Sequence, residues 1–157
     1  MKKIKSIIVV LCSLAILSGT ANARTLSYGN ERERSKEILH RTAFVITEAH
    51  RTVNEHHVYT GDLARAIAHQ HYARELYHSG EFLKAIYHSR RARALAVRAI
   101  EANHGIVPKD IGYTHEDEEF FRSAPPDNEL DAHIRTAKPS EPMKDEDIIK
   151  LKIDVDL

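Results

Sequence analysis

The stretch "TGDLARAIAHQHYARELY" at residues 60–77 returns nineteen residues later as "SGEFLKAIYHSRRARALA" at residues 79–96. The two copies align without a gap, with glycine, acidic, Ala-Ile, histidine, Ala-Arg and leucine positions in common. Glycine readily takes the left-handed conformation that ends a helix, and a hydroxyl or acid beside it caps the helix that follows. The repeat therefore predicts two consecutive helices, each entered through a tight turn.

A longer helical region surrounds the repeat. Residues 31–104 contain no proline and only two glycines, and their apolar residues recur at spacings of three and four. We expect helices near 31–58, 62–78 and 81–104, and the short joints make neighbouring helices antiparallel. The predicted fold is all-α, with an antiparallel helical hairpin or three-helix core in a helical domain over 31–105. The stripe of the first helix comprises Ile38, Thr42, Val45, Ile46, Ala49 and Val53. That of the third comprises Phe82, Ala85, Ile86, Ser89, Ala92, Ala96, Ala99 and Ile100.

The second half of the repeat resembles a known family. "LYHSGEFLKAIYHSRRARAL" is similar to the tetratricopeptide repeat around its helix-helix turn, where Gly80, Phe82, Ala85 and Ala92 occupy the glycine, aromatic and small packing positions. The resemblance covers about one repeat, residues 66–98, and it implies a helical hairpin.

The N-terminus has the pattern of a secretory signal. Three lysines precede an apolar run, and small residues follow at Ala21 and Ala23. An uncleaved membrane anchor would need about 20 apolar residues, more than this run provides. We expect a signal peptide over 1–23, a linker over 24–30 and a periplasmic or secreted protein without a transmembrane anchor after cleavage. Cleavage would also remove Cys12, the single cysteine.

Charge divides the chain into two unlike halves. Residues 24–105 carry 13 Lys and Arg against 9 Asp and Glu, whereas residues 106–157 carry 7 against 14. A basic half and an acidic half are expected to contact each other. The modest positive charge does not favour nucleic acid as a partner.

The acidic half contains all five prolines. We expect an acidic, partly irregular tail over 106–147, with short helices near 115–123 and 128–137. Residues 149–157 alternate apolar and charged side chains, which predicts a strand-like segment over 148–157. Such a segment would pair with a second copy or with the sheet edge of another protein, and a frayed tail or short helix is the alternative. The apolar positions are Ile149, Leu151, Ile153, Val155 and Leu157.

All eleven histidines follow the signal region, and several lie near acids. Glu-x-x-His pairs at 37–40 and 75–78 resemble di-metal carboxylate bundles in spacing. Their residues lie off the apolar stripes, however, which disfavours a di-metal enzyme. A looser hypothesis is a Zn, Cu or Ni site, with solvated histidines as the alternative. The candidate ligands are Glu37, His40, His56, His57, Glu75, His78 and His104.

Two further features suggest binding. A polar stripe on the third helix would hold an anion or the acidic segment 115–119, unless it is simply solvated; it comprises Lys84, Tyr87, Arg91 and Arg98. Protonating all eleven histidines would change the charge after cleavage from −3 to +8, which suggests pH-responsive binding.

No phosphate loop, nucleophile elbow or zinc-protease motif occurs in the sequence. We therefore expect an exported, non-catalytic protein-interaction or structural protein that needs no cofactor. Its partner would be another periplasmic or envelope protein, or a second copy bound through the C-terminal segment. A histidine-based metal binder and a pH-responsive binding protein are the alternatives.

Overall fold

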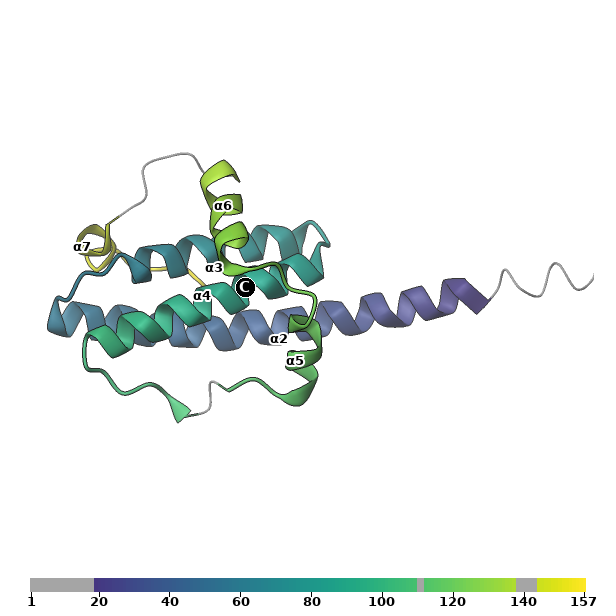
Figure 1. The fold of residues 1–157 in the computed structure, drawn as a ribbon, viewed down its shortest axis with the longest axis horizontal. Coiled ribbons are helices and arrows are strands. Elements are labelled where there is room, and N and C mark those ends of the chain that lie inside the picture. Colours follow the sequence, from purple (N-terminus) through teal and green to yellow (C-terminus); the bar gives the residue numbers. More distant parts are fainter. Residues whose placement is uncertain (1–18, 110–111, 138–143) are drawn as a thin grey trace, which may run out of the picture.

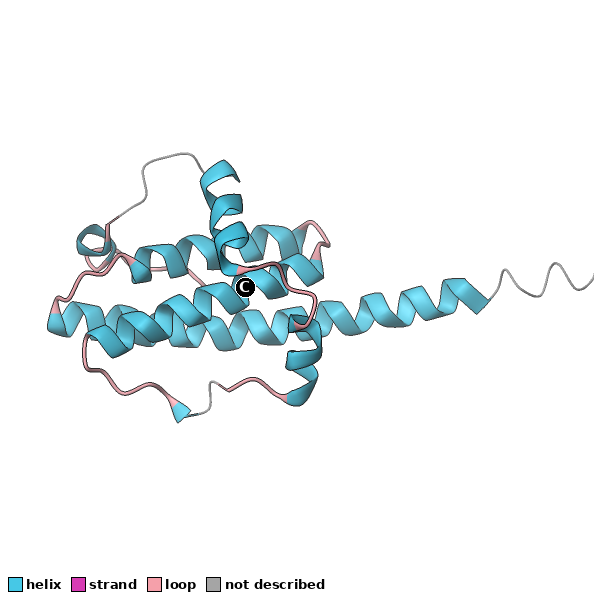
Figure 2. Ribbon diagram, viewed as in Figure 1, coloured by secondary structure: helices cyan, strands magenta, loops and turns pink. Residues whose placement is uncertain are grey.

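A computed structural model describes residues 19–109, 112–137 and 144–157 of the chain. Three long helices, α2 (Gly19–His56), α3 (Asp62–His78) and α4 (Phe82–Ala102), pack against one another as an antiparallel bundle (Figure 1). Three short helices follow: α5 (His115–Phe121), α6 (Asp127–Ala137) and α7 (Asp145–Ile148). Figure 2 shows helices and loops only, and no strand occurs in the described residues. The all-α prediction is confirmed.

The core lies where the helical periodicity predicts it. Every residue of the first and third predicted stripes is buried, including the polar Thr42 and Ser89. Many of the contacts are made by alanine, whose small side chain lets the helices approach closely. The bulkier core residues that fill the bundle include Ile46, Leu63 and Leu95.

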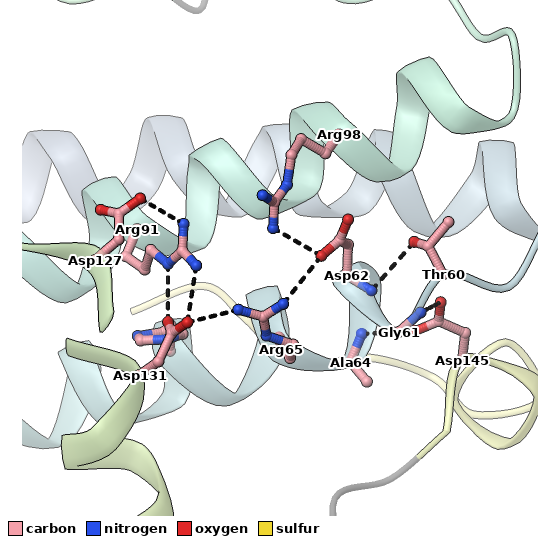
Figure 3. Close-up of polar contacts among 11 residues, drawn as sticks. Thr60, Gly61, Asp62, Ala64, Arg65, Arg91, Arg98, Asp127, Asp131 and Asp145 are labelled. Atoms are coloured by element: carbon pink, nitrogen blue, oxygen red, sulfur yellow. Dashed lines mark hydrogen bonds and ion pairs between the residues drawn. The ribbon is translucent and has the colours of Figure 1, made fainter. Parts of the chain in front are cut away.

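Both predicted turns contain glycine in the left-handed conformation, with φ of 79° at Gly61 and 83° at Gly80. The cap of α3 comes from an unexpected place. The Asp145 carboxylate accepts hydrogen bonds from the backbone N–H of Gly61 (2.7 Å) and of Ala64 (2.8 Å) (Figure 3). The start of α3 is therefore fixed by a residue from the acidic half of the chain.

The first helix begins earlier than predicted. The sequence suggested a linker over 24–30, but α2 already begins at Gly19 and extends well beyond the bundle (Figure 1). An isolated glycine such as Gly29 costs a helix only about 1 kcal/mol, which flanking turns can offset. Residues 1–18 of the predicted signal peptide lie outside the described residues. Among the described helices, none combines the length and apolar character needed to span a membrane.

The strand prediction for 148–157 is wrong. Ile148 ends α7, and residues 152–157 run without strand pairing along α2 and α3. Their carbonyl groups accept hydrogen bonds from side chains of α3, so no sheet partner is needed. The apolar alternation marks only part of the side that faces the bundle. Val155 is buried, and Ile149 and Ile153 are partly buried against the core, but Leu151 is 51% exposed.

The segments of the acidic half cover the three grooves of the bundle. Helix α5 lies against α2 and α4, α6 lies against α3 and α4, and residues 144–157 lie against α2 and α3. The predicted contact between the basic and acidic halves is confirmed, and it takes the form of an acidic wrapping around a basic bundle.

Candidate functional site

The repeated histidines, His69 and His88, meet beneath α6. Their Nδ1 atoms are 3.0 Å apart, and each residue is 2% exposed. The next repeated positions also meet, because Ser89 donates from Oγ to Oε1 of Gln70 at 3.1 Å. The two copies of the repeat thus face each other across antiparallel helices. We call His69 and His88 the histidine pair.

Asp131 of α6 joins the histidine pair to the arginines of the bundle, and Figure 3 shows its contacts with Arg65 and Arg91. It accepts from Nε2 of His69 at 3.1 Å and from Nη2 of Arg65 at 2.6 Å. Arg91 donates to both of its oxygens at 2.9 Å, and a third bond from Arg91 reaches Asp127 at 2.7 Å. One carboxylate therefore bridges α3, α4 and α6.

Burial alone would raise the pKa of Asp131. The bonds and charges of Arg91 and Arg65 outweigh that effect and hold its pKa well below the usual range. Asp131 is consequently a carboxylate at neutral pH and only accepts hydrogen bonds. This charge state fixes the proton positions next to it: His69 carries its proton on Nε2, and its Nδ1 accepts from the Nδ1–H of His88.

The histidine pair is held in the neutral form. Burial lowers the pKa of His69 to about 4, although Asp131 opposes the change. Burial, followed by the charges of His69 and His133, lowers the pKa of His88 to about 3. The edge of the Tyr72 ring also packs 4.7 Å from the His88 ring, centroid to centroid. A proton added to Nδ1 of His69 would set two N–H groups against each other, so the contact between the two rings requires a neutral His69.

The predicted binding stripe on α4 is occupied by the chain itself. Tyr87 is buried and its hydroxyl lies 2.7 Å from Oγ of Ser123. Arg91 is buried against α6, Arg98 donates to Asp62 at 2.9 Å, and Lys84 pairs with Glu81. Of the four stripe residues, Arg91 alone is paired with the acidic helix α6.

The segment 115–119 binds a different helix from the one expected. Its Asp117 is fully buried and accepts from Nη2 of Arg41 in α2 at 2.8 Å, while Arg34 lies 3.5 Å away. Burial alone would raise the pKa of Asp117, but Thr114 and Arg41 lower it overall. Asp117 therefore pairs with α2, whereas the sequence placed segment 115–119 on the polar stripe of α4.

The predicted metal ligands do not converge. His40 pairs with Asp156, Glu37 with Arg34, and His57 contacts the hydroxyl of Tyr59 at 2.9 Å. Over residues 19–109, 112–137 and 144–157, no group of three or more His, Cys, Asp or Glu side chains is placed to hold a metal ion. The remaining predicted ligands, His56, Glu75, His78 and His104, belong to no such group either.

Sequence reasoning missed the residues that matter most in this cluster. Asp131 and Asp127 gave no signal beyond their position in a predicted short helix. The repeat does not by itself predict the contact between His69 and His88. Matched positions of two antiparallel helices contact each other only when the helices are aligned along their axes so that these positions lie at the same level. Comparison with known proteins adds no family, because no family model, curated protein or solved structure matches the chain.

Proposed function

We propose that the protein is an exported, non-catalytic helical protein that acts by binding another protein. The supporting observation is the arginine face of α3 and α4, comprising Arg65, Arg91 and Arg98. Arg65 and Arg91 already hold an acidic helix from their own chain, and Arg98 pairs with Asp62 of α3. The partner that suits this face is an acidic, helix-forming segment. The leader-like sequence over residues 1–23 supports export.

The attachment of α6 is of the kind that an outside helix can replace. Leu130 is the buried residue of α6, and the rest of its attachment consists of ion pairs and a ring contact between His133 and His88. Asp127 and Asp131 lie one helical turn apart and both bind Arg91. Any helix with two carboxylates at this spacing offers the same pair of charges.

Binding that responds to pH is a second candidate function, and the histidine pair favours it. While α6 is in place the pair stays neutral, with the pKa of His69 at about 4 and that of His88 at about 3. If α6 leaves, water reaches both rings, and a solvated histidine has a pKa of about 6.5. Proton uptake between these values favours the open form, so mild acid would expose the arginine face.

The test uses a fluorescent peptide of residues 125–137, titrated into the full chain by anisotropy. Replacing Asp127 and Asp131 together by Asn in the protein weakens the resident helix. The double variant should therefore bind the peptide at least about tenfold more tightly than the wild type, because competition within the chain is reduced. A peptide with the same two replacements should fail to bind, and a Glu129→Gln peptide is the matched control. A double variant that folds but does not bind the wild-type peptide would refute the proposal.

A further inference from the structure

A second face of the bundle holds an extended polypeptide. Residues 152–157 lie along α2 and α3, in a groove that we call the tail groove; its polar residues are His40, Gln70, His71 and Arg74. This groove is separate from the arginine face, so a ligand can occupy one of the two faces without help from the other.

Gln70 is the central residue of the tail groove. Its Nε2 donates to the carbonyl of Leu39 at 2.9 Å and to that of Val155 at 3.1 Å. Its Oε1 accepts from Ser89, and the residue is fully buried. The amide is thus held from both α2 and α4, with one N–H aimed at the tail. A donor fixed in this way binds a backbone carbonyl without loss of side-chain freedom.

Side chains also bind the carbonyl group of Asp154, the residue that precedes Val155. The carbonyl oxygen of Asp154 accepts from Nε2 of His71 and from Nη1 of Arg74, both at 2.8 Å. The carboxylate of Asp154 is 84% exposed, so the strong contacts are to its backbone. Hydrogen bonding to the main chain at successive residues is how proteins recognise extended peptides with little regard to sequence.

The apolar side chains at every second position of the tail determine which peptides the tail groove can accept. Val155 enters the main core cluster, Leu157 packs against the cluster of Leu39 and Leu76, and Ile153 is partly buried. Lys152, Asp154 and Asp156 point to solvent. The groove therefore accepts apolar side chains at three alternate positions.

We infer that the tail groove is a peptide-binding site whose resting occupant is the chain's own C-terminal segment. Its external ligand is an extended segment of another protein with apolar residues at three alternate positions. The tail shows the chemistry of that ligand, since the groove binds it through backbone carbonyls and alternate apolar side chains. Because the tail is on the same chain, it competes at a high effective concentration. An outside segment binds when it contacts the groove better or when the tail is weakened.

The first experiment keeps the whole chain but makes the tail exchangeable. A protease recognition sequence replaces residues 138–143, and cleavage leaves residues 144–157 held by contacts alone. A fluorescent peptide of residues 144–157 should then exchange into the protein, and unlabelled peptide should compete. A Val155→Asp peptide should compete at least about tenfold less well, because a charge would enter the core. A Lys152→Gln peptide should compete as well as the wild type.

The second experiment uses the intact chain with Val155→Asp in its own tail. Reduced competition should let this variant bind the wild-type peptide more tightly than the unmodified protein does. Equal affinities, absence of exchange after cleavage, or loss of the helical circular dichroism on cleavage would each overturn the inference. Dimers formed by tail exchange between copies, with no peptide uptake, would also overturn it. The peptide of residues 125–137 should not compete, which separates this site from the arginine face.

Discussion

At the scale of single residues, Asp131 is the most heavily connected group in the described structure around the histidine pair. It bonds His69, Arg65 and Arg91, and Arg91 is itself 7% exposed. Removing one partner of a buried ion pair leaves the other charge without compensation, which is far more costly than losing a surface pair. Asp131 and Asp127 therefore provide a matched comparison, since both bind Arg91 but Asp127 is 57% exposed.

Asp131→Asn is expected to lower the free energy of unfolding by about 3 kcal/mol, because it removes the negative charge beside the buried Arg91. Asp127→Asn should cost less than about 1 kcal/mol, because the carboxylate of Asp127 is mostly exposed and Arg91 keeps Asp131. Urea unfolding at pH 7, followed by circular dichroism, measures both. Equal losses in the two variants would show that burial does not decide the strength of this pair.

At the scale of elements, α3 depends on a cap that lies far away in sequence. The helix starts after Gly61, which has no side chain to cap it, and the Thr60 hydroxyl accepts from the N–H of Asp62 at 3.3 Å. Asp145 binds the N–H groups of Gly61 and Ala64 at shorter distances. Asp145 is almost fully buried and opens α7. One carboxylate thus fixes the start of α3 and attaches the C-terminal segment to the bundle.

Asp145→Ala should lower the free energy of unfolding by about 1–2 kcal/mol, the usual cost of losing a helix cap. Amide hydrogen exchange should rise at Gly61 and Ala64, whose N–H groups lose their acceptor. Asp147→Ala is the control, since its exposed carboxylate is in the same short helix. Unchanged exchange at the start of α3 would contradict the capping role.

The three helices of the bundle could be predicted from the sequence. The positions of α5, α6 and residues 144–157 on its surface could not. Apolar periodicity and two turn glycines are local signals, so the three helices and their buried stripes followed from them. The last segment shows the limit of such signals. The alternation of apolar and charged residues identified which side of residues 152–157 faces the bundle. It did not reveal that the side chains of Gln70 and His71 would bind the backbone carbonyls in place of a neighbouring strand. That outcome depends on which side chains tertiary packing brings to the segment.

At the scale of the whole molecule, a basic bundle is wrapped by an acidic half. The charge counts predicted the attraction, but not its distribution over three grooves. Charge alone does not fix where each segment lies, and each segment also makes an apolar contact with the bundle. The contact residues are the partly buried Phe121 for α5, and the buried Leu130 for α6 and Val155 for the tail. The candidate site is therefore a product of the assembled molecule, and only its histidines were visible in the repeat.

The proposed export makes a prediction about the N-terminus of the protein. The protein isolated from the periplasmic fraction of a producing cell should begin at Arg24, because small residues at Ala21 and Ala23 form the expected cleavage site. Intact mass spectrometry measures this directly. Replacing Ala23 with Leu should block cleavage, whereas Asn22→Gln, at the tolerant middle position, should not. A cytoplasmic protein that retains Met1 would contradict export.

The histidine pair predicts how the stability of the whole molecule depends on pH. In the folded protein the pKa is about 4 for His69 and about 3 for His88, against 6.5 for an ordinary histidine. Between pH 6.5 and 4 the unfolded chain therefore binds more protons, and the free energy of unfolding falls as the pH falls. For His69 alone this loss is about 3 kcal/mol. Below pH 4, protonation of Asp131 in the unfolded chain adds a loss in the same direction, because its folded pKa is lowered.

Urea unfolding at pH 7, 6, 5 and 4 measures this slope. His88→Asn keeps an N–H donor for His69 but cannot be protonated, so the slope should decrease in that variant. His78→Asn is the control, because His78 is exposed at the end of α3 and its loss should leave the slope unchanged. A wild-type stability that is flat from pH 6.5 to 4 would mean that water already reaches the pair in the folded protein. In that case α6 would not be the cover that keeps the pair neutral.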